Sequence, residues 1–367
     1  MDLNRNMRFL VGIMLCLFIT NVAISIEIDE LPHPPVDAKP SFDPLLDKEA
    51  LQGIEYTFKD EYDKALSLFD TLIQKYPDHP GPYFFKAATY QNWMGSYRIN
   101  HFEDKLEYCV SMVIEKGEEA LKRNDDPWIY FYLGSAYGFR GYNRMTKHNW
   151  IGAYLDGRKG ISNFKKALEL DSTLYDVFLG LGSYHYWRTA KSKFIRIVAF
   201  WIPDKRELGL RQIEFSINHG RYCPDQAAYV LVSSLVDNKE YDRAYAVLEK
   251  ALSKREEPNI SDLYYKGYLM AKLENWPEAE SLFTRLFQHL ENYEYKSYSF
   301  LAECKYWIAK SLEKQNHQEL ALQVASEAIA FDQKRNQYDE VEGPLDSYKN
   351  IKEQLLVLIE HLNQKSE

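Results

Sequence analysis

Small and aromatic residues recur along this chain with the spacing of paired helices rather than with the alternation of strands. In residues 46–79, Gly53 and Ala65 lie 12 positions apart, and aromatic residues fill the places between and after them. Pro77 then ends the second helix, because proline lacks the N–H that a helix interior needs. This order of residues predicts a helix–turn–helix unit that stacks on copies of itself.

Six further units follow the first. Their predicted starts lie near residues 80, 127, 175, 225, 260 and 302. The steps between successive starts are 34, 47, 48, 50, 35 and 42 residues, so the second to fourth units carry inserts, at 95–110, 138–157 and 188–205. Since insertions in repeat proteins map to one side, we expect these inserts to share one edge or face. The pattern predicts an all-α, tetratricopeptide-type solenoid of helical hairpins with about seven helix pairs.

The N-terminal residues have a pattern of their own. Residues 1–25 are typical of a secretory signal peptide, because Arg5 and Arg8 precede an apolar run and Ala23-Ile24-Ser25 fits a small-x-small cleavage site. We therefore expect an exported protein, periplasmic or secreted. The alternative is an anchor formed by an uncleaved N-terminal segment, because the apolar stretch is nearly long enough to span a bilayer.

Three regions follow the signal peptide. Residues 26–45 form a proline-rich leader with little to bury. The repeats fill residues 46–340, and residues 341–367 contain an amphipathic helix. A terminal helix with a polar outer face is what the open end of a repeat stack requires, so we expect this helix to cap the solenoid.

Composition and motifs disfavour several classes of function. The chain has 367 residues and a formal net charge of −9, which makes nucleic acid a poor partner because phosphate binding needs a basic surface. The motifs of zinc proteases, serine hydrolases and phosphate-binding loops are absent. We therefore expect no enzyme activity, no metal and no cofactor. An unrecognised site around His185 is the alternative to a packed histidine.

The cysteines indicate neither a metal site nor a disulfide framework. After the signal peptide, Cys109, Cys223 and Cys304 are widely spaced. We expect buried thiols that behave as small hydrophobic side chains, with a single long-range bridge as the alternative.

An aromatic row is the first candidate binding surface. The fifth residue of each unit is aromatic in five of seven units, and these residues are Phe84, Phe131, Tyr229, Tyr264 and Tyr306. In a tetratricopeptide stack this position faces the concave groove, where rings give a peptide or docked helix rigid contact area. We therefore expect a non-catalytic scaffold of the cell envelope that binds protein or peptide through this groove. The alternative is that the inserts fold into the groove and bury the row.

Two other segments are candidates for binding. Residues 191–203 combine a basic start with seven large apolar residues, and their candidate contacts are Phe194, Ile197, Phe200 and Trp201. A membrane-surface helix has this composition, so a peripheral membrane or envelope-assembly factor is the alternative function. A buried crosspiece between two units is the other interpretation. The other candidate is a basic cluster that comprises Arg140, Arg144, Lys147, His148, Arg158 and Lys159. This cluster either binds an anionic group or forms a solvated face.

The middle of the chain resembles a known family. The most specific string is Asp204-Lys205-Arg206-Glu207-Leu208-Gly209-Leu210, which follows Leu179-Gly180-Leu181-Gly182 and an apolar insert. These strings resemble the eukaryotic tetratricopeptide repeat protein 39 and inclusion-body-clearance family, and more closely its bacterial relatives, which are exported solenoids. The resemblance covers residues 127–225. It implies a helical-repeat fold and a non-catalytic character, and it supplies no site residues. The eukaryotic members look intracellular, so their cellular roles are not carried over to a chain with a signal sequence.

Overall fold

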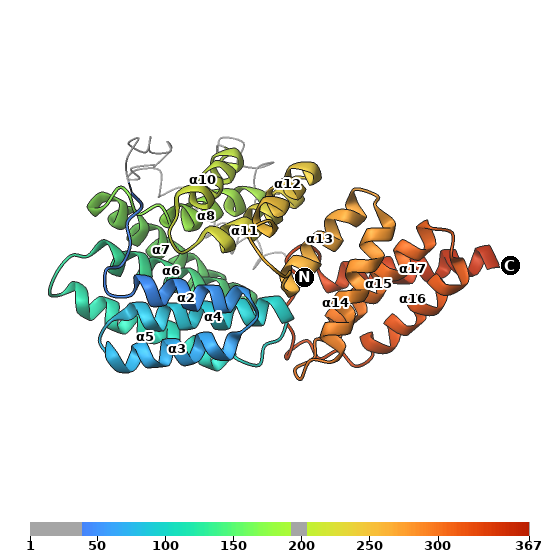
Figure 1. Ribbon diagram of the computed structural model, residues 1–367, viewed down its shortest axis with the longest axis horizontal. Helices are drawn as coiled ribbons and strands as arrows, with labels where there is room; N and C mark the ends of the chain where they lie inside the picture. Colours follow the sequence, from blue (N-terminus) through green and yellow to red (C-terminus); the bar gives the residue numbers. More distant parts are fainter. Residues whose placement is uncertain (1–38, 192–203, 367) are drawn as a thin grey trace, which may run out of the picture. The chain divides into compact units, whose positions relative to one another are not determined.

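The computed structural model describes residues 39–191 and 204–366. Within these residues the chain forms fifteen helices (Figure 1), and the only strand-like pairing is an isolated bridge between Ile99 and Glu340. The helices are α2 (Asp47–Phe58), α3 (Tyr62–Lys75), α4 (Pro80–Tyr97), α5 (Glu103–Leu121), α6 (Pro127–Thr146), α7 (Trp150–Leu170), α8 (Val177–Lys191), α10 (Arg206–His219), α11 (Pro224–Asp237), α12 (Tyr241–Leu252), α13 (Ile260–Lys272), α14 (Trp276–Glu291), α15 (Tyr298–Lys314), α16 (Gln318–Asp332) and α17 (Tyr348–Ser366).

Successive helices pack in pairs, as predicted. In the described part of the chain the first helices of the pairs are α2, α4, α6, α8, α11, α13 and α15, and their partners are α3, α5, α7, α10, α12, α14 and α16. α17 follows the last pair and packs on α15 and α16. The first helices begin at residues 47, 80, 127, 177, 224, 260 and 298, within four residues of the predicted starts. The all-α solenoid of helical hairpins is therefore confirmed.

Two glycines allow the helices of the fourth pair to approach closely. Gly182 on α8 and Gly209 on α10 face each other, and a Cβ added at either one would lie 2.7 Å from the backbone oxygen of the other. A side chain can move aside to make room, whereas the backbone of a packed helix cannot without disturbing its own hydrogen bonds. This crossing therefore has no room for a larger residue.

Six of the turns within pairs lie among the described residues, and they share one geometry. One residue adopts a left-handed backbone, with φ between 54° and 67°. The N–H of the next residue donates to the carbonyl five positions earlier, at 2.8–3.1 Å. This bond satisfies a carbonyl at the end of the first helix and reverses the chain. The left-handed residues are Asp60, Arg98, His148, Lys239, Glu274 and Asn316.

The inserts lengthen helices instead of forming loops. α2 and α3 have 12 and 14 residues, whereas α4 and α5 have 18 and 19, and α6 and α7 have 20 and 21. The inserts at 95–110 and 138–157 span the turns of these longer pairs and the helical halves beside them. These two inserts lie beside each other, since Leu106 of the first and Phe139 of the second line one pocket. That all three inserts share one face stays a prediction. The third insert, at 188–205, lies largely outside the described residues.

The segment just before α2 joins later pairs of the stack. The buried carboxylate of Asp43 accepts a hydrogen bond from the hydroxyl of Tyr132 at 2.8 Å, and its backbone N–H donates to the hydroxyl oxygen of Tyr222 at 3.0 Å. Asp47, at the start of α2, forms an ion pair with Arg221 at 2.7 Å. These contacts connect the beginning of the solenoid to α6 and to the start of α11.

Candidate functional site

The predicted aromatic row lies inside the protein. Phe84, Phe131, Tyr229, Tyr264 and Tyr306 are only 2–7% exposed. The rings of Phe84 and Phe131 pack edge to face with centroids 5.5 Å apart, and each of the three tyrosine hydroxyls donates a hydrogen bond within the protein. The expectation of an exposed row is therefore wrong, because these rings fill the space between packed helices. In this structure a ligand cannot reach them.

Part of the first insert covers one ring of this row, that of Tyr264. The guanidinium of Arg98, in the turn after α4, lies 4.4 Å from the ring centroid of Tyr264 and 3.8 Å from that of Phe300. Arg98 also forms an ion pair with Glu303, and both side chains are at most 3% exposed. An arginine of the chain itself thus occupies the position where an open groove would offer Tyr264 to a ligand.

The second predicted site lies outside the described residues; it comprises Phe194, Ile197, Phe200 and Trp201. Among the helices that the structure describes, none is long and apolar enough to cross a membrane.

His185 and the three cysteines are held within the helix stack. Nδ1 of His185 lies 2.7 Å from Oε1 of the buried Gln212, an arrangement in which the ring nitrogen donates to the amide oxygen. Cys109, Cys223 and Cys304 are unbridged. Burial raises the pKa of the Cys109 thiol to about 11, so the thiol stays protonated at neutral pH.

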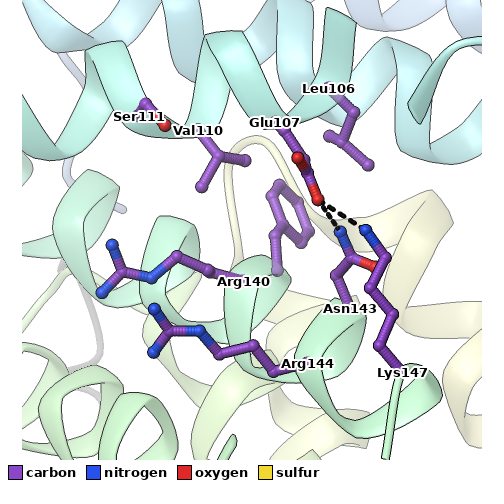
Figure 2. Close-up of a pocket in the computed structure, with 9 residues that line it drawn as sticks. Leu106, Glu107, Val110, Ser111, Arg140, Asn143, Arg144 and Lys147 are labelled. Carbon is purple, nitrogen blue, oxygen red and sulfur yellow. Dashed lines mark hydrogen bonds and ion pairs between the residues drawn. The ribbon is translucent and has the colours of Figure 1, made fainter. Parts of the chain in front are cut away.

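The described surface is hollowed between the lengthened halves of α5 and α6 (Figure 2). Leu106 and Val110 of α5 and Phe139 of α6 give this α5–α6 groove an apolar lining, and its volume is about 230 Å³. Pockets that enclose small molecules are typically larger, roughly 300–1,000 Å³. The groove therefore suits one or two side chains of a larger partner better than an enclosed small molecule.

Two arginines mark one end of the groove, where they extend side by side from α6 (Figure 2). Arg140 binds the carboxylate of Asp156 through Nε at 3.0 Å and Nη2 at 2.8 Å, and Arg144 binds it through Nη1 at 2.7 Å. These hydrogen bonds hold the pKa of Arg140 above its ordinary value. A guanidinium has five N–H donors, so the bonds to Asp156 leave both arginines with donors for a further anionic group.

The other end of the groove is neutralised by acidic side chains (Figure 2). Glu107 accepts hydrogen bonds from Asn143 at 2.7 Å and from Lys147 at 2.9 Å. Lys147 also pairs with Glu103 at 2.7 Å, and this hydrogen bond raises the pKa of Lys147. The arginine end is thus the part of the groove with the stronger attraction for an anion.

The predicted basic cluster is brought together only in part. Arg140, Arg144 and Lys147 line the groove, because their spacing places them on one face of α6. Arg158 and Lys159 lie exposed on α7 and do not line it. Sequence reasoning missed the lining residues of α5, which lie beside α6 only once two neighbouring pairs have packed.

The known proteins that match this chain are solved structures of low sequence identity. No known family profile matches the chain, and no curated protein matches it. Among solved structures, the C-terminal part of a TPR repeat-containing protein from Cytophaga hutchinsonii is 19% identical, with a TM-score of 0.39, and the match covers 78% of this chain and 97% of that one. Yeast Tom70 is 17% identical, with a TM-score of 0.39 and coverage of 92% and 68%. The TPR domain of P58(IPK) is 14% identical, with a TM-score of 0.29 and coverage of 88% and 99%.

Proposed function

We propose that this chain is a non-catalytic scaffold that binds a protein or peptide, and that the α5–α6 groove is its binding site. One observation carries the proposal: the groove combines an apolar lining with two arginines at one end. Helical-repeat proteins in general bind partners through surfaces that neighbouring repeats build together, and this groove lies between the second and third pairs.

The lining predicts the chemistry of the partner. Leu106, Val110 and Phe139 favour an apolar side chain, and the unused donors of Arg140 and Arg144 favour a carboxylate beside it. A peptide with an apolar residue next to an acidic residue, or next to a C-terminal carboxylate, offers both groups. Lys147 contributes less, because Glu103 and Glu107 already compensate its charge.

Selection from a random peptide library against the full chain tests this proposal. We expect the enriched peptides to carry an apolar residue beside a carboxylate. Ser111 is exposed and lines the groove, so the larger side chain of Ser111→Trp should block the groove. The affinity of the enriched peptides should then fall tenfold or more, which is the size of effect expected when an anchor contact is lost. Ser326→Trp, at an exposed serine on α16, is the matched control. Peptides that bind the Ser111→Trp variant as well as the unaltered chain would show that their site is elsewhere.

The place of action is a proposal of its own. The N-terminal pattern supports export, with the mature protein beginning near Ile26. N-terminal sequencing of the natural protein tests this, and an intact Met1 or Met7 in a membrane fraction would favour the anchor instead. Membrane contact through residues 191–203 stays a prediction, because most of that segment lies outside the described residues.

A further inference from the structure

Exposed apolar side chains gather at the turn between α6 and α7. Of thirteen large apolar side chains that are exposed in the described part of the chain, five lie between residues 142 and 155, so this short stretch departs from the rest of the surface. Trp150 is 59% exposed, Ile151 63% and Leu155 52%. Ile151 and Leu155 are one helical turn apart and share one side of α7, with Trp150 beside them. We call Trp150, Ile151 and Leu155 the α7 patch.

The surroundings of the α7 patch are cationic. Residues 138–160 contain five Lys or Arg residues and one acidic residue, in a chain whose net charge is −9. That acidic residue is Asp156, which is buried and bound by two arginines. Three of these cations line the α5–α6 groove and pair with acidic side chains there, which leaves Arg158 and Lys159 as the cations of the patch. Arg158 and Lys159 follow the patch by one turn, and both are exposed. No ion pair joins either of them to an acidic side chain in the described residues.

Helix geometry places a cation beside the apolar side chains. Ile151, Leu155 and Arg158 lie at i, i+4 and i+7, so they follow one side of α7 over about 10 Å at 1.5 Å per residue. An amphipathic helix that lies in a membrane surface presents this combination, with apolar side chains reaching the acyl boundary and Lys or Arg at the level of the headgroups. Tryptophan is enriched at the same level.

We infer that the α7 patch docks on an anionic lipid surface. The patch is too small for a stable protein interface, which takes roughly 20–30 residues on each side. A bilayer needs no such shape complementarity, and it adds electrostatic attraction for each nearby cation. The inference uses a different surface from the α5–α6 groove, so either proposal can fail alone.

Vesicle binding by the full chain tests the inference. The chain should bind vesicles that contain phosphatidylglycerol and should bind neutral phosphatidylcholine vesicles at least tenfold less. The difference should shrink as salt rises, because salt screens exposed charges. Arg158→Glu with Lys159→Glu should weaken binding by roughly fivefold or more for each cation replaced. Trp150→Ser with Ile151→Ser should weaken binding as well, at unchanged helix content.

Matched control variants distinguish vesicle binding through the α7 patch from binding through other parts of the chain, such as residues 1–25 with their apolar run. Leu356→Ser with Val357→Ser removes two exposed apolar side chains of α17 and should leave binding unchanged. A fluorescent dansylalanine at position 151 should shift to the blue with anionic vesicles, whereas one at position 357 should not. Equal binding to both kinds of vesicle, no binding, or patch variants that bind like the unaltered chain would overturn the inference. A dimer that dissociates in the Trp150→Ser, Ile151→Ser variant would assign the patch to a second copy instead.

Discussion

At the scale of single residues, Arg98 combines two unusual features. Its backbone is left-handed, with φ 54°, and its side chain is 3% exposed between two aromatic rings. Glu303, its partner, is 1% exposed. Burying two opposite charges costs desolvation free energy, which their attraction offsets only while both charges are present. Removing either side chain therefore leaves the other as a buried charge without a counter-charge.

Replacing Arg98 by Met should lower the free energy of unfolding by about 3–5 kcal/mol, because Glu303 then stays buried without a counter-charge. Arg98→Met combined with Glu303→Gln should recover most of that loss, because glutamine removes the charge and keeps an oxygen acceptor for the buried Tyr264 hydroxyl. Urea denaturation of the two variants measures both effects. If the double variant is as unstable as the single one, the uncompensated carboxylate is not the cause of the loss.

Gly182 permits a test of packing, because a Cβ added there would meet two backbone atoms, the oxygen of Gly209 and the nitrogen of Ile213, as well as the Ile213 side chain. Gly182→Ala should destabilise the fold by roughly 1–3 kcal/mol through overpacking at the crossing of α8 and α10. Gly157 is the matched control, since it lies within α7 and an added Cβ there meets no atom within 4 Å. Gly157→Ala should stabilise by up to about 1 kcal/mol, because alanine is the better helix former. Thermal unfolding measures both effects. Midpoint temperatures that shift in the same direction for the two variants would contradict this account.

At the scale of helices and turns, the pairs were predictable and the turns were not. Small residues recur where the helices of a pair cross, and Gly53 and Gly267 indeed face the rings of Phe69 and Phe283. This spacing repeats along the sequence, so it locates the first helix of each pair. The turns give no such signal, because the usual mark of a helix end is glycine and none of the six left-handed residues is glycine. The lengths of the inserts were predictable from the spacing between successive first helices. That the inserts extend the helices was not predictable from this spacing.

The left-handed turns should be improvable. Lys239 is exposed, and its side chain makes no hydrogen bond or ion pair with the residues that the structure describes. Lys239→Gly should raise the free energy of unfolding by about 0.5–1 kcal/mol, because glycine adopts a positive φ without the clash of a Cβ. Lys250→Gly, within α12, should cost about 1 kcal/mol. In chemical denaturation, the midpoint of Lys239→Gly should therefore lie above that of the unaltered chain and the midpoint of Lys250→Gly below it. A midpoint for Lys239→Gly below that of the unaltered chain would argue against strain at this turn.

At the scale of the whole described chain, contacts between distant repeats explain what sequence reasoning missed. An open solenoid has contacts only between neighbouring repeats, and that premise placed the aromatic row in an open groove. The ion pair between Arg98 and Glu303, which are 205 positions apart, joins repeats that are not neighbours. No periodic pattern in the sequence marks either residue. The α5–α6 groove was half predictable: the spacing of Arg140, Arg144 and Lys147 is visible on α6, but its partner helix is known only after packing.

The segment before α2 gives the last prediction, because it joins the beginning of the stack to α6 and to the start of α11. Asp43→Ala removes the acceptor of the buried Tyr132 hydroxyl, which should cost about 1–3 kcal/mol. Asp43→Asn keeps an oxygen acceptor and should cost less. The Asp43 carboxylate also accepts from the N–H of Leu45 at 2.9 Å and so holds the local backbone, whose N–H at position 43 donates to Tyr222. Asp43→Ala should therefore speed amide hydrogen exchange around residues 127–132 and 221–224, and leave α13 to α16 unchanged.

Lys48→Ala is the control for that experiment, since Lys48 is exposed one residue into α2 and forms no ion pair in the described chain. It should leave the exchange rates of both regions unchanged. If Asp43→Ala speeds exchange only within residues 39–47, the segment lies on the stack without stabilising it. If exchange rises in the two distant regions together, a short segment before the first repeat stabilises repeats that a purely nearest-neighbour solenoid would leave independent of it.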